Sequence, residues 1–260
     1  MCFNQVYDHL TANNLLIVNQ SAYRKNHSCE TALIKICNDT LSLLDSSTNV
    51  VIALLDFTAA FDTLHHELLI NKLQYKYGLS SNVLKWFKSY LKDRVLRVKI
   101  GEFISNGKPM NFGVPQGSVL GPLLFCLYIQ EINEIICNYD LRFHCFADDI
   151  QIYSPMTAND QQLQVIKDCL NKIKIWANQN SLKLNDSKTK FVEIKTRNSN
   201  ISTTFNNTFV CDASAKNLGV TIDSNLYFSD QINNVCKRGF GLLRQLWRIS
   251  YKLNNVSLKT

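Results

Sequence analysis

The chain has 260 residues, a length that fits one large domain or two small ones with a sizeable buried core. Apolar residues make up 46% of it and charged residues 19%, which excludes a largely disordered protein. The formal net charge of +7 is compatible with a phosphate-rich partner but does not single one out.

The cysteines and the apolar segments indicate the cellular compartment of the protein. The nine cysteines are odd in number and include no CxxC pair, so a reduced intracellular protein of the cytoplasm or nucleus fits better than a secreted or zinc-binding one. The N-terminus has no basic region followed by an apolar run and predicts no signal peptide. The longest apolar stretch, 119–129, is interrupted by Gly121 and Pro122 and is too short to cross a membrane, so no membrane partner is expected.

The spacing of apolar residues predicts both helices and strands. In chain order, helices are expected at 31–44, 65–77 (ending at Gly78), 82–91 and 160–178, and strands at 50–55, 95–100 and 191–194. Residues 141–153 read as two short strands around a turn at 147–149. The continuous apolar run at 50–55 suits a fully buried central strand, whereas the alternation at 95–100 suits an edge or half-exposed strand. The pattern is α+β.

Basic residues gather at the end of the chain. From Gln231 onwards there is no acidic residue and there are six basic ones. Arg244, Arg248 and Lys252 are four apart, so on a helix they would form one stripe. Such a stripe is typical of a helix laid along a nucleic-acid backbone, but also of an ordinary solvated helix face.

Three aspartates stand where a charge is unfavourable. Asp56 directly follows the buried run, and a carboxylate there must be paired or bind a metal ion. Asp148 and Asp149 are adjacent like charges, so each is driven towards protonation unless a cation neutralises them. Mg²⁺ prefers oxygen ligands, and two such ions about 3.5–4 Å apart can stabilise the attacking and leaving oxygens of a phosphoryl transfer. Taken singly, Asp148-Asp149 equally well forms a solvated turn, and Asp56 a strand end or helix cap.

The segments around these aspartates resemble the motifs of one enzyme family. Phe146-Ala147-Asp148-Asp149 resembles the aromatic-x-Asp-Asp box of reverse transcriptases. Residues 56–62 resemble their first catalytic box, in the Asp-x-x-x-Ala-Phe-Asp form of non-LTR (LINE-type, jockey-like) retrotransposons and group II introns. Residues 113–125 look like the template-and-nucleotide box that lies between the other two. Three boxes in the family's order make a specific signal.

The resemblance implies a right-hand polymerase fold of the α+β class, with an antiparallel palm sheet flanked by helices. Residues 1–48 would be partial fingers, 49–222 the palm with inserted fingers elements, and 223–260 the start of the thumb. The motifs within the palm are expected at 56–62, 113–125, 146–149, 185–189 and 217–220. Against the family pattern, the earliest fingers motif, the endonuclease region and most of the thumb are missing, so a fragment or truncated copy is expected.

The implied activity is RNA-directed DNA polymerisation by two-metal phosphoryl transfer. Asp56, Asp148 and Asp149 would hold two Mg²⁺ ions, with Mn²⁺ as an alternative. The implied partners are an RNA template (the element's own RNA), a DNA primer and deoxynucleoside triphosphates. Lys188, in a segment similar to the palm motif Asn-x-x-Lys-Thr, would act as a catalytic lysine that neutralises the pyrophosphate leaving group.

Nucleotide and primer contacts also follow from the resemblance. Residues 20–25 are similar to the fingers motif Gln-x-Gly-Phe-Arg, with Ala22 in place of the usual glycine, and Arg24 becomes a candidate contact to the triphosphate. Phe61 matches the aromatic side chain that excludes a ribonucleotide's 2′-hydroxyl. The remaining candidates lie beside the nucleotide, at Gln116 and Gly117, or grip the primer end, at Leu218 and Gly219.

Alternatives stay open at two levels. A catalytically inactive, truncated nucleic-acid-binding remnant would keep the basic surface without the chemistry. An RNA-dependent RNA polymerase shares the Asp-Asp turn, but Phe61 disfavours it because ribonucleotide use needs a small or polar residue beside the sugar. At single positions, Arg24 could be an ordinary surface arginine, Phe61 a plain core aromatic and Lys188 one lysine among many.

Overall fold

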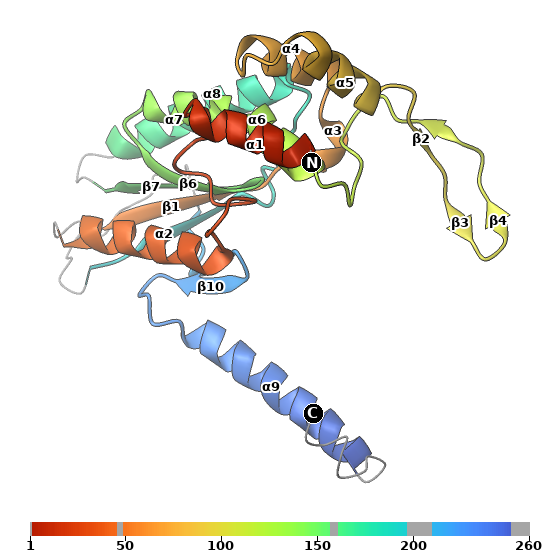
Figure 1. Ribbon diagram of the computed structural model, residues 1–260. Helices are drawn as coiled ribbons and strands as arrows, with labels where there is room; N and C mark the ends of the chain where they lie inside the picture. Colours follow the sequence, from red (N-terminus) through yellow and green to blue (C-terminus); the bar gives the residue numbers. More distant parts are fainter. Residues whose placement is uncertain (1, 46–48, 157–160, 197–209, 251–260) are drawn as a thin grey trace.

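The computed structural model describes residues 2–45, 49–156, 161–196 and 210–250 (Figure 1). At its centre lies a four-stranded antiparallel sheet in the order β6-β7-β1-β8. Its strands are β1 (Val50–Leu55), β6 (Arg142–Phe146), β7 (Asp149–Pro155) and β8 (Lys190–Ile194). The sequence predicted all four strands, and the antiparallel sheet with helices between its strands confirms the α+β class.

The central strand β1 is buried on both faces. Val51, Ala53 and Leu55 belong to one core, and Val50 and Ile52 belong to a second core on the opposite face. Successive side chains of a strand point to opposite faces, so a strand covered by layers on both sides needs an unbroken apolar run. The run at 50–55 supplies it.

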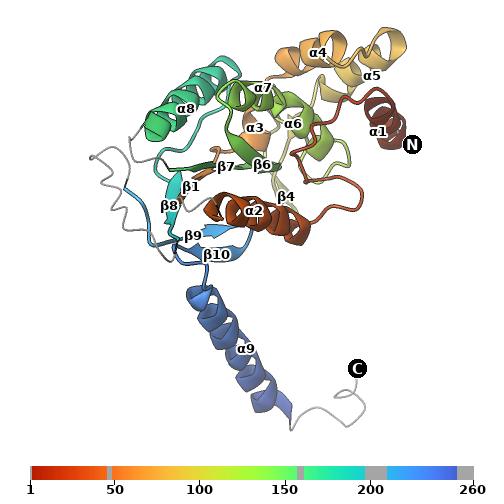
Figure 2. The same ribbon diagram turned by 90° about the vertical axis from the view of Figure 1, so that its left-hand side faces the viewer.

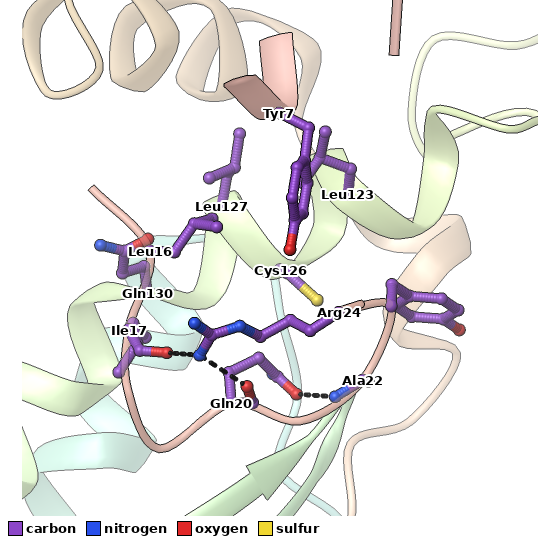
Figure 3. A pocket seen from close by; sticks show the side chains of 11 residues that line it. Tyr7, Leu16, Ile17, Gln20, Ala22, Arg24, Leu123, Cys126, Leu127 and Gln130 are labelled. Atoms are coloured by element: carbon purple, nitrogen blue, oxygen red, sulfur yellow. Dashed lines mark hydrogen bonds between the residues drawn. The ribbon is translucent and has the colours of Figure 1, made fainter. Parts of the chain in front are cut away.

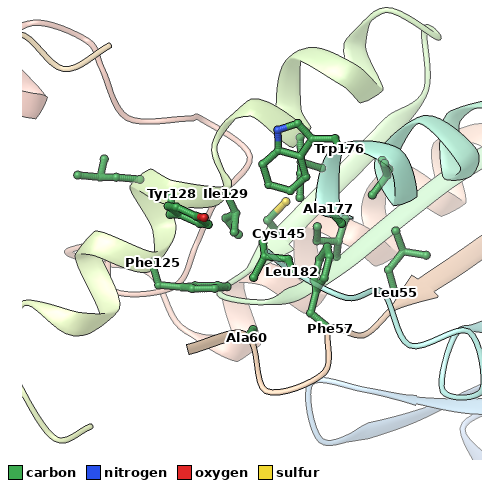
Figure 4. Close-up of a cluster of buried hydrophobic side chains, with 14 of the residues drawn as sticks. Leu55, Phe57, Ala60, Phe125, Tyr128, Ile129, Cys145, Trp176, Ala177 and Leu182 are labelled. Carbon is green, nitrogen blue, oxygen red and sulfur yellow. The ribbon is translucent and has the colours of Figure 1, made fainter. Parts of the chain in front are cut away.

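Helices α6 (Gly121–Ile129), α7 (Glu131–Cys137) and α8 (Gln161–Gln179) cover one face of the sheet (Figure 2). In this core, Phe125 of α6, Trp176 of α8 and Cys145 of β6 lie close together (Figure 4). Helix α6 was not predicted from the sequence. Every residue in it except Pro122 is buried, and a helix that is apolar all round shows no helical period to detect.

Helix α2 (Cys29–Leu44) and the hairpin of β9 (Ser214–Asn217) and β10 (Val220–Asp223) cover the other face (Figure 2). Helix α2 begins at a capping box, which places its start two residues before the predicted one. The Ser28 hydroxyl accepts from the Thr31 N–H, and the Thr31 hydroxyl accepts from the Ser28 N–H. These bonds satisfy two backbone donors that would otherwise lack partners.

The remaining helices of this part are α1 (Cys2–Ala12), α3 (Ala60–Thr63), α4 (His66–Tyr75) and α5 (Ser81–Leu91) (Figure 1). The sequence predicted α4 and α5 but gave no signal for α1. Helix α4 ends at Tyr75, before Gly78, which takes a left-handed φ of 68° after the helix. A glycine at such a position stops a helix without steric strain.

Residues 95–109 form an arm that projects from the body (Figure 1). The arm pairs β2 (Val95–Leu96) with β5 (Lys108–Pro109), and β3 (Lys99–Ile100) with β4 (Phe103–Ile104). The edge character predicted for 95–100 is confirmed, but these residues form two short strands, β2 and β3, instead of one, and all side chains of the arm are exposed. Alternation specifies two unlike faces of a strand, but it does not specify whether another layer covers one of them.

Helix α9 (Ser229–Ser250) extends away from the sheet at the other end of the molecule (Figure 1). None of its residues is buried. It carries the predicted basic residues Arg244 and Arg248, while Lys252 lies outside the described residues. Of the helices within the described ranges, none combines the length and the apolar character that crossing a membrane requires.

One hydroxyl group ties three helical elements together. The Tyr128 hydroxyl, on α6, donates to the Asn180 carbonyl after α8 (2.7 Å) and accepts from the His65 N–H before α4 (3.3 Å). Tyr128→Phe leaves both backbone groups without this partner, so the free energy of unfolding should fall by about 1–3 kcal/mol. Urea unfolding followed by circular dichroism measures the change.

The control is Tyr75→Phe, because the Tyr75 side chain is 80% exposed. It should alter the free energy of unfolding by no more than about 0.5 kcal/mol. A Tyr128→Phe protein as stable as the control would contradict the bridging role.

Candidate active site

Asp56 and Asp149 meet at one end of the sheet. The antiparallel register pairs Leu55 of β1 with Ile150 of β7, so the two aspartates lie just beyond that pair on neighbouring strands. Both line a cleft of about 560 Å³. Strand pairing thus joins two motifs that are far apart in the sequence.

Asp148 lies in the tight turn between β6 and β7. Phe146 pairs with Asp149, which leaves only Ala147 and Asp148 in the turn. Ala147 has a φ of 56°, in the left-handed region that residues with a Cβ rarely adopt. Its backbone is held by the side chain of Gln20, for which no role was predicted from the sequence.

The three aspartates repel one another electrostatically. Burial, followed by repulsion from Asp148 and Asp56, raises the pKa of Asp149 to about 6. Burial also raises the pKa of Asp148, against a hydrogen bond from its own backbone, and Asp56 adds to the increase. The site therefore concentrates negative charge that a proton or a cation must relieve.

One oxygen of Asp56 has no hydrogen-bond partner. This atom, Oδ2, is fully buried, and Lys188 Nζ lies 3.4 Å from it without the geometry of a hydrogen bond. The Lys188 side chain is 66% exposed, so water screens the ionic contact and it offsets little of the burial penalty. A buried carboxylate oxygen without a donor is a suitable ligand for a hard cation.

The donor set suits a divalent ion without forming a closed metal centre. Within the described residues, no three or more His, Cys, Asp or Glu side chains are arranged to hold one ion. Mg²⁺ commonly takes one or two protein carboxylates and completes its shell with water and substrate phosphates. The residues present therefore fit an ion that binds together with its substrate.

Residues from two further motifs line the same cleft. Lys188, Leu218 and Gly219 lie there with Asp56 and Asp149. Leu218 and Gly219 form the turn between β9 and β10, with φ values of 46° and 87°. The structure thus gathers the candidate primer grip, the candidate lysine and two of the aspartates around one space.

A second pocket, of about 240 Å³, contains the candidate nucleotide contacts Phe61, Gln116 and Gly117. The Phe61 ring stacks on Phe125, with ring centroids 4.3 Å apart. Tyr23 also lines this pocket, and its pKa is raised by burial, by Cys126 and by Asp148. Tyr23 was not predicted as a site residue, although its place in the fingers motif was a signal that could have found it.

Gln116 and Gly113 both lie against the first catalytic box. Gln116 Nε2 donates to Asp62 Oδ1 (2.9 Å). At Gly113, which has a φ of 78°, an added Cβ would lie 2.8 Å from the backbone of Asp62. Gly117 also has a positive φ of 75°, but an added Cβ there would meet open space. Gly113 thus serves chain packing, whereas the surface at Gly117 is free for a ligand.

Arg24 lies in a different, smaller pocket (Figure 3). Its Nη1 donates to the carbonyls of Ile17 (2.6 Å) and Gln20 (3.1 Å), and more weakly to that of Val18 (3.4 Å). The guanidinium thus holds the loop that precedes the fingers motif. The structure does not bring it into the pocket of Phe61 and Gln116, so its contact with a triphosphate stays a prediction.

Comparison with known proteins gives the family of the chain. A family model described as "Reverse transcriptase (RNA-dependent DNA polymerase)" matches residues 2–222. The chain belongs to the reverse transcriptase family. The family expected from the three sequence motifs is thereby confirmed.

Its relatives include "Probable RNA-directed DNA polymerase from transposon BS" and "RNA-directed DNA polymerase from mobile element jockey", both from Drosophila melanogaster. They are 26% and 27% identical to it over 96% and 92% of this chain. The chain spans only 28% and 27% of their lengths.

Solved telomerase structures share the fold. "Structure of telomerase from Candida albicans in complexe with TWJ fragment of telomeric RNA" matches with a TM-score of 0.62 and 16% identity, over 85% of this chain and 37% of that one. "Structure of apo telomerase from Candida Tropicalis" matches with a TM-score of 0.61 and 14% identity, over 88% and 40%. This likeness, together with the antiparallel sheet, confirms the right-hand polymerase fold.

The raised pKa of Asp149 predicts how stability depends on pH. Without metal, the folded state binds this proton more tightly than the unfolded state, so Asp149 destabilises the fold progressively as the pH rises from 3.8 to about 6. Asp149→Asn removes the charge. Allowing for solvent screening, it should raise the melting temperature by about 2–4 °C above about pH 7 and leave the value below about pH 4 unchanged. Thermal unfolding across this pH range in a chelator measures both.

Added Mg²⁺ provides the second arm of this test. It should stabilise the unaltered protein, because a cation that binds only the folded state shifts unfolding, and it should stabilise Asp149→Asn much less. The control is Asp93→Asn, in the exposed segment that leads into the arm, which should change neither result. Equal pH profiles for all three proteins would contradict the repulsion among the aspartates.

Proposed function

We propose that the chain is the polymerase core of an RNA-directed DNA polymerase from a LINE-type, non-LTR retrotransposon. It would extend a DNA primer with deoxynucleotides on an RNA template, the element's own RNA. The single observation that carries this proposal is the cleft in which Asp56 and Asp149 lie beside Lys188, Leu218 and Gly219. Family membership and the names of the curated relatives support it.

The proposed fingers, palm and thumb subdomains correspond to successive parts of the chain. Residues 1–48 would contribute to the fingers, 49–222 would form the palm with inserted fingers elements, and 223–260 would begin the thumb. The central sheet, with the cleft at its end, supports the palm assignment, and the projecting helix α9 with its basic residues supports the thumb assignment. Arg244 and Arg248 would contact nucleic-acid phosphates, whose charge dominates non-specific affinity.

Membership of the reverse transcriptase family implies dependence on divalent metal ions. Asp56, Asp148 and Asp149 would hold Mg²⁺, or Mn²⁺ as an alternative, and the buried oxygen of Asp56 that accepts no hydrogen bond supports this assignment. When bound, such ions activate the primer 3′-hydroxyl and stabilise the charge of the departing pyrophosphate. The inactive remnant gains no support, because these carboxylates are unfavourable in the fold unless they bind a cation.

The other side chains would position the reactants. Leu218 and Gly219 would hold the primer end beside the aspartates, since they line the same cleft. Lys188 would place positive charge near the leaving pyrophosphate, and its ammonium group already lies at the edge of the carboxylate cluster. Arg24 would reach the triphosphate only after releasing the carbonyls that it now binds.

Phe61, Gln116 and Gly117 would form the nucleotide pocket. The Phe61 ring is fixed by stacking on Phe125, so its bulk has a defined position against the sugar. A rigid ring without a polar group leaves no room for a 2′-hydroxyl and offers it no hydrogen bond. Selection of deoxynucleotides would therefore be steric.

The protein would act inside the cell, in the cytoplasm or the nucleus. All nine cysteines are free thiols, as expected in a reducing compartment. Three of them, Cys126, Cys145 and Cys169, are buried and belong to the packed interior.

Asp148→Asn tests the metal role. It should lower primer extension by about a thousandfold or more, because losing a charged ligand removes several kcal/mol of transition-state stabilisation. Affinity for a template–primer duplex should stay nearly unchanged, since phosphate contacts by Lys and Arg supply most of it. Extension on an RNA template with Mg²⁺ and deoxynucleotides, together with filter binding, measures both.

Asp140→Asn is the matched control, because Asp140 is exposed just before β6. It should leave extension and binding as they are. If Asp148→Asn lost binding and extension in parallel, the metal role would have to be abandoned for a structural one.

Phe61→Val tests whether the polymerase selects deoxynucleotides over ribonucleotides. Opening the pocket should raise ribonucleotide incorporation relative to deoxynucleotide by about one to three orders of magnitude, with deoxynucleotide use falling only modestly. Single-nucleotide incorporation with each sugar measures the ratio.

Phe87→Val is the control, because Phe87 is fully buried on α5 and does not line the nucleotide pocket. It should reduce stability and leave the sugar ratio unchanged. An unchanged ratio in Phe61→Val as well would make Phe61 a core residue only.

A further inference from the structure

Gln20 is a buried residue of the fingers motif that lies against the catalytic hairpin. Only 6% of its surface is exposed. It forms a parallel bridge with Cys145 of β6, and the flanking backbone extends the pairing. The Ser21 N–H donates to the Cys145 carbonyl (3.0 Å), and the Cys145 N–H donates to the Asn19 carbonyl (2.7 Å). The fingers segment thus runs beside the outer strand of the sheet.

The Gln20 side chain binds both backbone polar groups of Ala147. Its Oε1 accepts from the Ala147 N–H (3.0 Å), and its Nε2 donates to the Ala147 carbonyl (3.3 Å). Oε1 also accepts from the Ala22 N–H (2.9 Å), a bond visible in Figure 3. One side chain therefore fixes the peptide groups on both sides of the first turn residue.

This turn needs an external restraint. Ala147 carries a Cβ and yet has a φ of 56°, which its own conformational preference opposes. Asp148 follows at once, and Asp149 begins β7, so the two carboxylates repel each other at the site of the strain. In a turn of two residues, a small rotation at Ala147 redirects the side chain of Asp148.

We propose that Gln20 is a positioning residue of the polymerase, whose side-chain amide holds the turn so that Asp148 and Asp149 keep their orientation at the cleft. This inference rests on the proposed function, because it assumes that these aspartates carry the chemistry. Gln20 itself does not line the cleft of the aspartates, so it acts through the backbone of Ala147 alone.

Arg24 holds the backbone of the loop that carries Gln20. Its Nη1 donates to the carbonyls of Gln20 and Ile17, which fixes the loop from which the Gln20 side chain extends (Figure 3). The connection runs from Arg24 to Gln20, from Gln20 to Ala147, and from there to Asp148. Side-chain hydrogen bonds thus link the fingers motif to Ala147, and the backbone leads from Ala147 to Asp148.

The test compares Gln20→Met with Gln130→Met. Methionine is close to glutamine in size but lacks the amide, so the space stays filled while the hydrogen bonds disappear. Gln130 lines the same small pocket as Gln20, and its side chain makes two hydrogen bonds where that of Gln20 makes three: it donates to the Leu15 carbonyl (2.8 Å) and accepts from the Tyr77 hydroxyl (3.0 Å). Neither of these bonds reaches the turn, which makes Gln130 a matched control.

Two readouts in the 260-residue chain separate positioning from general stability. For single-nucleotide incorporation, Gln20→Met should lower kcat by about 10- to 100-fold and change KM for the deoxynucleotide by less than about threefold. Hydrogen exchange of the Ala147 amide should become at least about tenfold faster. Gln130→Met, even with a similar loss in melting temperature, should leave both kcat and the exchange of Ala147 unchanged.

Each contrary result has a distinct meaning. Unchanged exchange at Ala147 in Gln20→Met would overturn the restraint itself. Faster exchange with unchanged kcat would overturn its role in catalysis. If the unaltered chain failed to extend any primer, the proposed function and the catalytic role would fall together, and the exchange of Ala147 would still decide whether Gln20 holds the turn.

Discussion

The antiparallel pairing of β1 with β7 is the contact on which the candidate site depends. Its register sets Leu55 opposite Ile150 and thereby brings Asp56 next to Asp149. A slip of one residue would turn every side chain of the strand to the other face, which would break both hydrophobic cores and separate the carboxylates. The cores on the two faces of the sheet, built on Val51 and Ile52 among others, therefore fix the site as well as the fold.

At the end of this sheet, the carboxylates that suit metal binding reduce the stability of the fold. Burial and mutual repulsion raise the pKa of Asp148 and Asp149, and one oxygen of Asp56 has no donor. Such an arrangement destabilises the folded protein until a cation binds, and the surrounding cores have to offset it. An enzyme that binds metal ions together with its nucleotide would use this imbalance, because the ions are then held most strongly when substrate phosphates complete their shell.

The fingers segment contributes to the site in two ways that the motifs alone do not reveal. The side chain of Gln20 holds the turn at Ala147, and Tyr23 lines the pocket of Phe61 while lying within electrostatic range of Asp148. A stretch of four residues thus touches both the turn that carries Asp148 and the pocket that contains Phe61. The position of this stretch therefore affects both the turn and the pocket.

The sequence by itself determined the four sheet strands and helices α2, α4, α5 and α8, because each is specified by a local period or by a continuous apolar run. It also singled out the three aspartates, because each is an unfavourable charge beside apolar residues or beside another carboxylate. Only the tertiary structure decided the features that depend on partners distant in the chain. Helix α6 is buried on all sides and shows no period, and the arm at 95–109 alternates like a half-buried strand although no described layer covers it. The side chains of Arg24 and Gln20 bind backbone carbonyl and N–H groups. Every residue type except proline carries both groups, so the identity of the partner residues gives no sign of these bonds in the sequence.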